Sequence, residues 1–149
     1  MNEIQAVKTA KIEEVKKNSK KGFTLVELVV VIAIPVVSST IASSQRSTAL
    51  SDAQTLELAL KEAHAQIVAK DTSVYTDAAT VADVISEKSL QSIHVGDTRT
   101  IGGDTYTLSW CAADDKCYWM NGTTNLDSSI TPGGTTVAIA TGDVVSTLF

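Results

Sequence analysis

One long apolar run dominates the N-terminal third of the chain. It starts at Phe23 and contains a single charged residue, Glu27, and a single proline, Pro35. A membrane-spanning helix needs about 20 residues at 1.5 Å each. The run reaches that length if it continues through residues 38–42, where hydroxyl side chains can bond back to helix carbonyls. We expect a transmembrane helix over residues 23–42, kinked at Pro35 because proline removes a helical hydrogen bond.

A helical period returns beyond the serine-rich patch that follows the apolar run. Apolar residues recur at alternating spacings of four and three, which places them on one stripe of a helix: Ala49, Ala53, Leu56, Leu60, Ala63 and Ile67. Glu57 and Lys61 are spaced as an ion pair on another side. We expect residues 43–70 to continue the first helix as an amphipathic one, and Ser51 with Gln54 could cap a restart of the helix.

The remaining sequence, residues 71–149, is expected to form a globular head. Thr80 and Asp83 have the spacing of a capping box, and the apolar positions after them predict a short helix over residues 80–90. The period then changes to two, which is typical of half-buried strands.

Strand signals occupy the last third of the chain. Residues 98–101 and 104–110 flank Gly102-Gly103, a strong hairpin signal. A third strand would bring Cys117 back opposite Cys111. Residues 135–141 and 144–149 are further strand candidates, separated by glycine-containing turns. The pattern predicts an α+β fold in which a long helix packs on an antiparallel sheet of four to five strands.

Charge is distributed unevenly along the 149 residues. Residues 1–22 hold six lysines and three glutamates, whereas the rest of the chain holds six basic and fourteen acidic residues. A basic head before an apolar run predicts that the lysines stay cytoplasmic and that the acidic body lies outside the membrane. A net charge of −5 also argues against direct nucleic-acid binding as a function.

Two ordinary membrane-targeting segments could share this pattern. A secretory signal peptide would have a small-residue cleavage site after the apolar run, and residues 41–44 are a poor candidate for one. An uncleaved signal anchor would leave Glu27 as a lone carboxylate in an apolar helix, which is costly. Glu27 therefore favours an interpretation that gives this carboxylate a partner.

The sequence Lys20-Lys21-Gly22-Phe23-Thr24-Leu25-Val26-Glu27 resembles the class III signal of type IV prepilins and pseudopilins. The resemblance implies that a prepilin peptidase cleaves after Gly22, removing residues 1–22, and that the new amino terminus at Phe23 is methylated. It also implies that Glu27 pairs with the terminal amine of a neighbouring subunit. Such a pair offsets the desolvation of both charges, so that Glu27 can set the register of assembly.

The resemblance implies a non-enzymatic structural subunit of a type IV pilus, or of a related filament that supports adhesion, motility or DNA uptake. Its expected partners are other pilin subunits, an assembly ATPase with its membrane platform, and the membrane before assembly. The final location would be an extracellular pilus. Two alternatives remain open: a pseudopilin of a secretion or competence system, and an anchored surface domain that binds a ligand without polymerising.

Candidate chemistry in the head is sparse. Cys111 and Cys117 could form a disulfide, a metal pair or two free thiols, and the expected extracytoplasmic location with the predicted hairpin favours the disulfide. Asp114 is expected in a solvated acidic loop, and His64 on an exposed helix face. Asn121-Gly122-Thr123 matches a glycosylation sequon, but Asn-Gly also favours a turn. No catalytic motif, metal site or cofactor is predicted.

Overall fold

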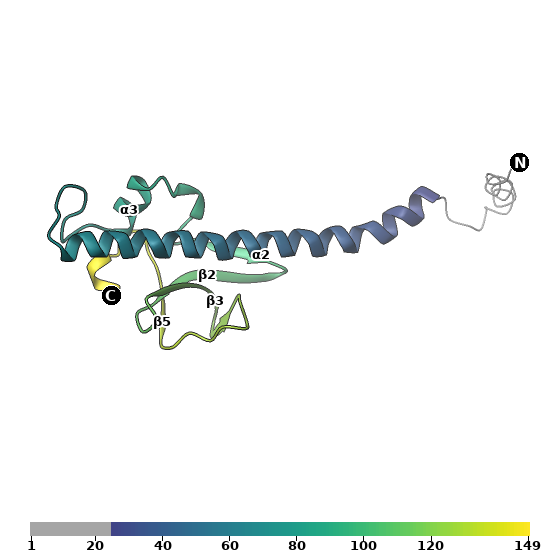
Figure 1. Cartoon of the computed structure of the whole chain (residues 1–149). Coiled ribbons are helices and arrows are strands. Elements are labelled where there is room, and N and C mark those ends of the chain that lie inside the picture. Colours follow the sequence, from purple (N-terminus) through teal and green to yellow (C-terminus); the bar gives the residue numbers. More distant parts are fainter. Residues whose placement is uncertain (1–24) are drawn as a thin grey trace, which may run out of the picture. The chain divides into compact units, whose positions relative to one another are not determined.

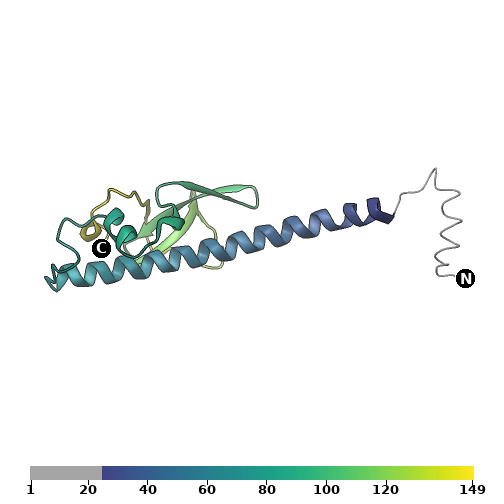
Figure 2. The same cartoon turned by 90° about the horizontal axis from the view of Figure 1, so that it is seen from above.

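The computed structural model describes the backbone of residues 25–149 and the side chains from residue 40 onward. Helix α2 (Leu25–Val68) enters a compact unit formed by residues 42–149. Within this unit, the helix packs on a small antiparallel sheet, and β2 and β3 lie alongside it in the two views (Figures 1 and 2). The predicted α+β fold, a helix on an antiparallel sheet, is therefore confirmed.

The predicted apolar stripe of α2 faces the core. All its members are at most 7% exposed, and four of them are fully buried. They are joined by Ala59, so that the buried side of the helix is Ala49, Ala53, Leu56, Ala59, Leu60, Ala63 and Ile67. Alanine lets the helix backbone approach the sheet closely, while the two leucines fill the space between them.

The helix does not restart at Ser51, so that part of the prediction is wrong. α2 is continuous, and the hydroxyls of its polar face bond within the helix instead of capping a new one. Thr48 Oγ1 donates to the Ser44 carbonyl at 3.0 Å, and Thr55 Oγ1 donates to the Ser51 carbonyl at 2.9 Å. Hydrogen bonds to the carbonyl four residues earlier satisfy these hydroxyls on an exposed helix face.

The sheet has five strands, arranged around β2. β1 (Thr98–Ile101) and β2 (Asp104–Cys111) form the predicted hairpin, and its two turn glycines have φ of +61° and +100°. β3 (Lys116–Asn121) lies on the other side of β2, followed by β4 (Thr124–Asn125). β5 (Thr136–Ala138) pairs with β2 on the same side as β1, beyond the end of β1.

Both faces of the central strands are buried. Tyr106, Leu108 and Trp110 on β2 face α2, as the alternation predicted, and Cys117 and Trp119 join them from β3. The opposite face carries a smaller cluster of Cys111, Tyr118 and Met120. β3 is therefore buried at four consecutive positions, which explains why its sequence does not alternate.

The predicted short helix and its capping box are confirmed. α3 (Val81–Glu87) begins after Thr80, whose hydroxyl accepts the Asp83 N–H at 3.4 Å while Asp83 Oδ2 accepts the Thr80 N–H at 2.8 Å. Val81 and Val84 are fully buried. A single turn of 3₁₀ helix, η1 (Gln91–Ile93), leads from α3 into β1.

The C-terminal segment differs from the prediction. Residues 144–149 do not form a strand: Val144 makes an isolated bridge with Thr80, and a 3₁₀ turn, η2 (Val145–Thr147), follows. The Val145 N–H bonds to the Ala79 carbonyl at 2.9 Å, and its side chain is fully buried. The burial of Val145 and its hydrogen bond to the loop before α3 therefore outweigh the strand propensity of residues 144–149.

No helix within the part that the structure describes has a stretch both long and apolar enough to cross a membrane. The span expected over residues 23–42 lies mostly outside the residues whose side chains are described.

We predict that Leu56→Ala destabilises the head strongly and that Leu58→Ala does not. Leu56 is fully buried, and its truncation should lower the free energy of unfolding by about 2–5 kcal/mol. Leu58, two residues further along the same helix, is 65% exposed, and its truncation should change the free energy by less than about 0.5 kcal/mol. Urea unfolding of the full chain in detergent, followed by tryptophan fluorescence, measures both. Equal losses would show that the stripe is not the core.

Candidate functional site

The residues of the N-terminal signal are only partly covered by the structure. Gly22 and Phe23 lie outside the described residues. Glu27 and Pro35 fall within the helical backbone of α2, but their side chains lie outside the described ones. The helix is assigned without interruption through Pro35, and the kink and the Glu27 contact stay predictions.

Trp119 connects α2 with the sheet. Its indole Nε1 donates a 2.7 Å hydrogen bond to the Ala49 carbonyl on the helix, and its side chain is 1% exposed. The guanidinium of Arg99 lies 5.4 Å from the centre of the Trp119 ring and bonds Asp52 of α2 at 2.8 Å. One aromatic side chain, one cation and one helix carboxylate therefore fix α2 against β1 and β3.

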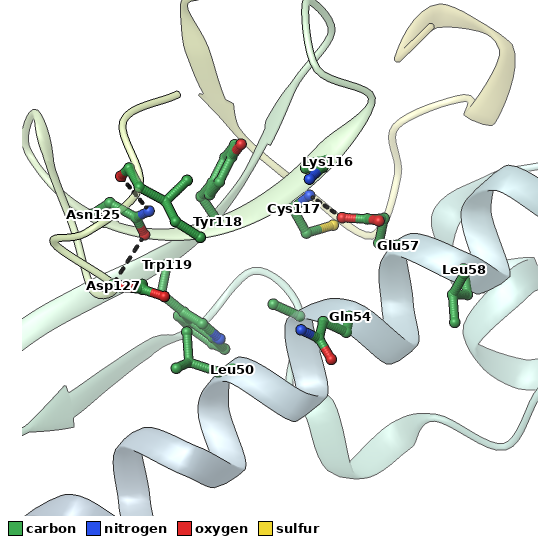
Figure 3. Close-up of a pocket in the computed structure, with 12 residues that line it drawn as sticks. Leu50, Gln54, Glu57, Leu58, Lys116, Cys117, Tyr118, Trp119, Asn125 and Asp127 are labelled. Carbon is green, nitrogen blue, oxygen red and sulfur yellow. Dashed lines mark hydrogen bonds between the residues drawn. The ribbon is translucent and has the colours of Figure 1, made fainter. Parts of the chain in front are cut away.

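A groove of about 320 Å³ lies between α2 and the β3–β4 side of the sheet (Figure 3). α2 contributes Leu50, Glu57 and Leu58, and β3 contributes residues 116–119. Ile130, from the segment after β4, completes the lining. Leu58 and Ile130 are 65% and 45% exposed, so the groove offers uncovered apolar surface.

The main polar groups in the groove already have partners within the chain. Glu57 Oε1 bonds Lys61 at 3.2 Å, as predicted, and Glu57 Oε2 accepts the backbone N–H of Cys117 at 3.3 Å. The Asn125 side chain donates to the Ile130 carbonyl at 3.0 Å and accepts the Asp127 N–H at 3.3 Å (Figure 3). The groove is therefore better suited to an apolar occupant than to a polar small molecule.

The predicted disulfide is absent, because the predicted register was wrong by one residue. Cys117 lies opposite Trp110, and Cys111 lies opposite Lys116. A one-residue shift moves a side chain to the other face of a sheet. Cys117 consequently faces α2, Cys111 belongs to the cluster on the opposite face, and both are buried free thiols.

Neither thiol is placed as a nucleophile. Burial raises the pKa of the Cys117 thiol well above its usual range, and the nearby Glu57 carboxylate raises it further. Because the thiolate is the reactive form, Cys117 stays protonated and acts as a small core side chain.

Asp114 is a structural residue and not simply a solvated one. Its Oδ2 accepts the Gly133 N–H at 2.6 Å and the Tyr118 hydroxyl at 2.9 Å. Both hydrogen bonds lower the pKa of Asp114, and the bond from Gly133 has the larger effect. Burial of the Tyr118 hydroxyl, and then its hydrogen bond to Asp114, raise the pKa of Tyr118 to about 12. A Cβ at position 133 would crowd the Asp114 carboxylate, so glycine allows this close approach without displacing that side chain.

The other acidic loops bond mainly to their own backbone. Asp71 and Asp127 each accept both the N–H and the hydroxyl of the serine two residues later. Asp143 accepts the Ala140 N–H at 2.8 Å. Among the described residues, no group of three or more histidine, cysteine, aspartate or glutamate side chains could hold a metal ion. These carboxylates close turns, as expected for short polar side chains in loops.

Two local predictions had different outcomes. Asn121 ends β3 and Gly122-Thr123 connects it to β4, with Gly122 at φ +60°, so the predicted turn is confirmed. His64 was expected to be exposed but is half-buried, stacked on Phe149 with ring centres 4.1 Å apart. Phe149 also makes an edge contact with Trp110 at 4.7 Å. Helix periodicity could not reveal this contact, because Phe149 is distant in sequence.

Residues 17–43 match the family model described as the prokaryotic N-terminal methylation motif. The chain carries a type IV pilin-type class III signal. This pilin-like signal indicates a structural protein that is anchored in the membrane and then built into a surface filament. It also implies processing by a peptidase and assembly with other pilins. No curated protein and no solved structure matches the pilin-like chain.

The free thiols give a direct test of the sheet register. We predict that the pilin-like chain, denatured without reductant in the presence of iodoacetamide, gains two carbamidomethyl groups by mass spectrometry. Native protein should react slowly, because Cys111 is fully buried and Cys117 is 7% exposed. Recovery of an unmodified chain that is alkylated only after reduction would contradict the register.

Asp114 gives a pH-dependent prediction. Its folded-state pKa is lowered, so its contribution to stability is present above the unfolded value of 3.8 and is lost as pH falls through the folded value. Asp114→Asn should therefore lower the thermal midpoint at pH 7 and have little effect near pH 2. Asp115→Asn is the matched control, because the neighbouring carboxylate makes none of the hydrogen bonds described for residues 40–149. Equal effects of the two variants at pH 7 would argue against the Asp114 contacts.

Proposed function

We propose that this chain is a structural subunit of a type IV pilus or a related surface filament. The observation that carries the proposal is the motif match over residues 17–43, which covers Lys17, Lys20 and Lys21, the Gly22–Phe23 junction and the apolar run. The helix packed on an antiparallel sheet supports it.

The proposed life cycle assigns a role to each part of the chain. Residues 1–22 form a cytoplasmic leader that a prepilin peptidase removes. Residues 23–42 anchor the subunit in the membrane and later join the filament core, kinked at Pro35. Residues 43–70 continue the helix under the head, and residues 71–149 form the head outside the membrane. An assembly ATPase and its membrane platform would draw the subunits into a pilus that serves adhesion, motility or DNA uptake.

Glu27 is the proposed assembly contact. After cleavage, the methylated amine of Phe23 carries a positive charge at the start of an apolar helix. In a bundle of such helices, an unpaired ammonium or carboxylate is costly, whereas the two together offset much of that cost. A subunit enters in the correct register when its amine meets Glu27 of a neighbour, and other registers leave both charges unpaired.

The cleavage site is tested by the mass of the mature protein. We expect a chain that begins at Phe23 and carries one additional methyl group, and we expect Gly22→Leu to block cleavage and leave the full precursor in the membrane. A start near residue 43 would indicate an ordinary secretory signal instead. An uncleaved wild-type chain in cells with an active prepilin peptidase would support a permanent anchor.

The role of Glu27 is tested separately from cleavage. Glu27→Ala should be inserted in the membrane and cleaved as well as the wild type, because the apolar run is retained, but its yield of sheared filaments should fall about tenfold or more. Immunoblots of membrane and sheared fractions measure both steps. Filaments at the wild-type level would exclude Glu27 as the register-setting contact.

A further inference from the structure

The segment that joins β4 to β5 crosses the sheet without forming a helix or a strand of its own. We call its residues 127–134 the strap. Since β4 is a neighbour of β3 and β5 is a neighbour of β2, the strap passes from one side of the β2–β3 pair to the other. Every residue of the strap is exposed except Asp127 and Pro132, which are half-buried. Little buried apolar area therefore holds the strap on the sheet.

The first half of the strap is fastened by a neighbour in sequence. The Asn125 side chain accepts the Asp127 N–H at 3.3 Å and donates to the Ile130 carbonyl at 3.0 Å. The positive charge of Arg46 on α2 also attracts Asp127. Because Ile130 lines the groove beside α2, this half of the strap belongs to the groove wall.

The second half of the strap is fastened by a residue that is distant in sequence. Among residues 40–149, the hydrogen bond that holds it to the rest of the head runs from the Gly133 N–H to Asp114 Oδ2, with a length of 2.6 Å and a separation of 19 residues. Asp114 is itself held, because the hydroxyl of Tyr118 donates to the same oxygen at 2.9 Å. Tyr118 is buried in β3, so Asp114 joins the strap to the sheet.

The end of the strap covers Cys111 on the face of the sheet opposite α2. A Cβ added at Gly134 would lie 3.8 Å from Cys111 Sγ and 2.8 Å from Ala113 Cβ, so the strap backbone packs directly on these side chains. Cys111 is fully buried, although most of the strap above it is exposed. Cys117 faces α2 instead and is not covered by the strap.

We propose that the second half of the strap, residues 131–134, opens as a local unit while the rest of the head stays folded, and that Asp114 is the latch that keeps it closed. Opening breaks one long-range hydrogen bond and uncovers little apolar surface, so it needs less free energy than global unfolding. It exposes Cys111, leaves Cys117 buried and loosens the groove wall next to Ile130. The inference concerns the head alone and does not rest on the proposed function.

Acid should release the same latch. Hydrogen bonds from Gly133 and then Tyr118 lower the pKa of Asp114, and burial opposes them. The titratable and charged groups that face this carboxylate are Cys111 from β2, with Tyr118 and Lys116 from β3, while the strap presents a backbone N–H. The charge of Asp114 therefore favours the closed strap above the ordinary value of 3.8, and this preference is lost as pH falls through the folded value.

The test measures both native cysteines of the full chain in detergent at once. Alkylation by iodoacetamide at pH 8 is followed by tryptic digestion, which separates Cys111 from Cys117 by cleavage after Lys116. Each rate is divided by the rate of the same cysteine in the urea-unfolded chain. Cys111 should then react at least about tenfold faster than Cys117, because local opening exposes Cys111 alone. Equal rates would show that only global unfolding exposes them, which would overturn the inference.

Two variants break the latch from opposite sides. Asp114→Asn removes the charged acceptor, whereas Gly133→Ala crowds the Asp114 carboxylate and retains its charge. Each should raise the Cys111 rate about tenfold or more and leave the Cys117 rate unchanged. Gly142→Ala is the matched control, because a Cβ there meets nothing within 4 Å. An increase in Asp114→Asn alone would indicate a direct effect of charge on the thiol, and an equal increase at both cysteines would indicate global destabilisation. Either result would overturn the inference.

The acid dependence is measured with a pyridyl disulfide reagent, which reacts with thiols in acid as well as at neutral pH. The difference between wild type and Asp114→Asn at Cys111 should disappear near pH 2, because both side chains are then neutral. Labelling of Cys117 at the same pH shows whether the head is still folded. A tenfold difference that persists at pH 2 would contradict the Asp114 charge as the latch.

Discussion

The close packing of α2 on the sheet is the constraint on which the rest of the structure depends. Ala49 is fully buried, and its carbonyl accepts the Trp119 indole hydrogen bond at 2.7 Å. A larger residue at that position would push the helix away and leave the indole N–H without its partner. The same contact determines which side of α2 stays uncovered, and it therefore places the groove between the helix and the β3–β4 edge.

Periodicity predicted those parts of the fold that are determined by local sequence. The α2 stripe, the capping box before α3 and the β1–β2 hairpin each follow from a spacing within one segment, and each is confirmed. The third strand is different, because its register depends on a turn of uncertain length. An error of one residue there placed Cys117 opposite Cys111 and suggested a disulfide, whereas the actual pairing with Trp110 puts the cysteines on opposite faces.

The functional features also separate into those that one segment of sequence predicts and those that only folding brings together. The signal around Gly22 and Glu27 is contiguous, so a short stretch of sequence was enough to predict it. The groove brings together Leu58 from the helix, Lys116 from β3 and Ile130 from a loop, and no sequence spacing relates them. The single local indication was Leu58, an apolar residue outside the buried stripe. The contact of Phe149 with His64 could likewise not be predicted, because the two residues are distant in sequence.

Electron cryomicroscopy of filaments sheared from the surface of cells that express this chain tests the central claim most directly. The account predicts a helical array of this chain, beginning at Phe23, with the first half of α2 bundled along the axis and the sheet of residues 98–138 outside it. Filaments built from other chains, with this one recovered only as a dispersed membrane protein, would contradict the account.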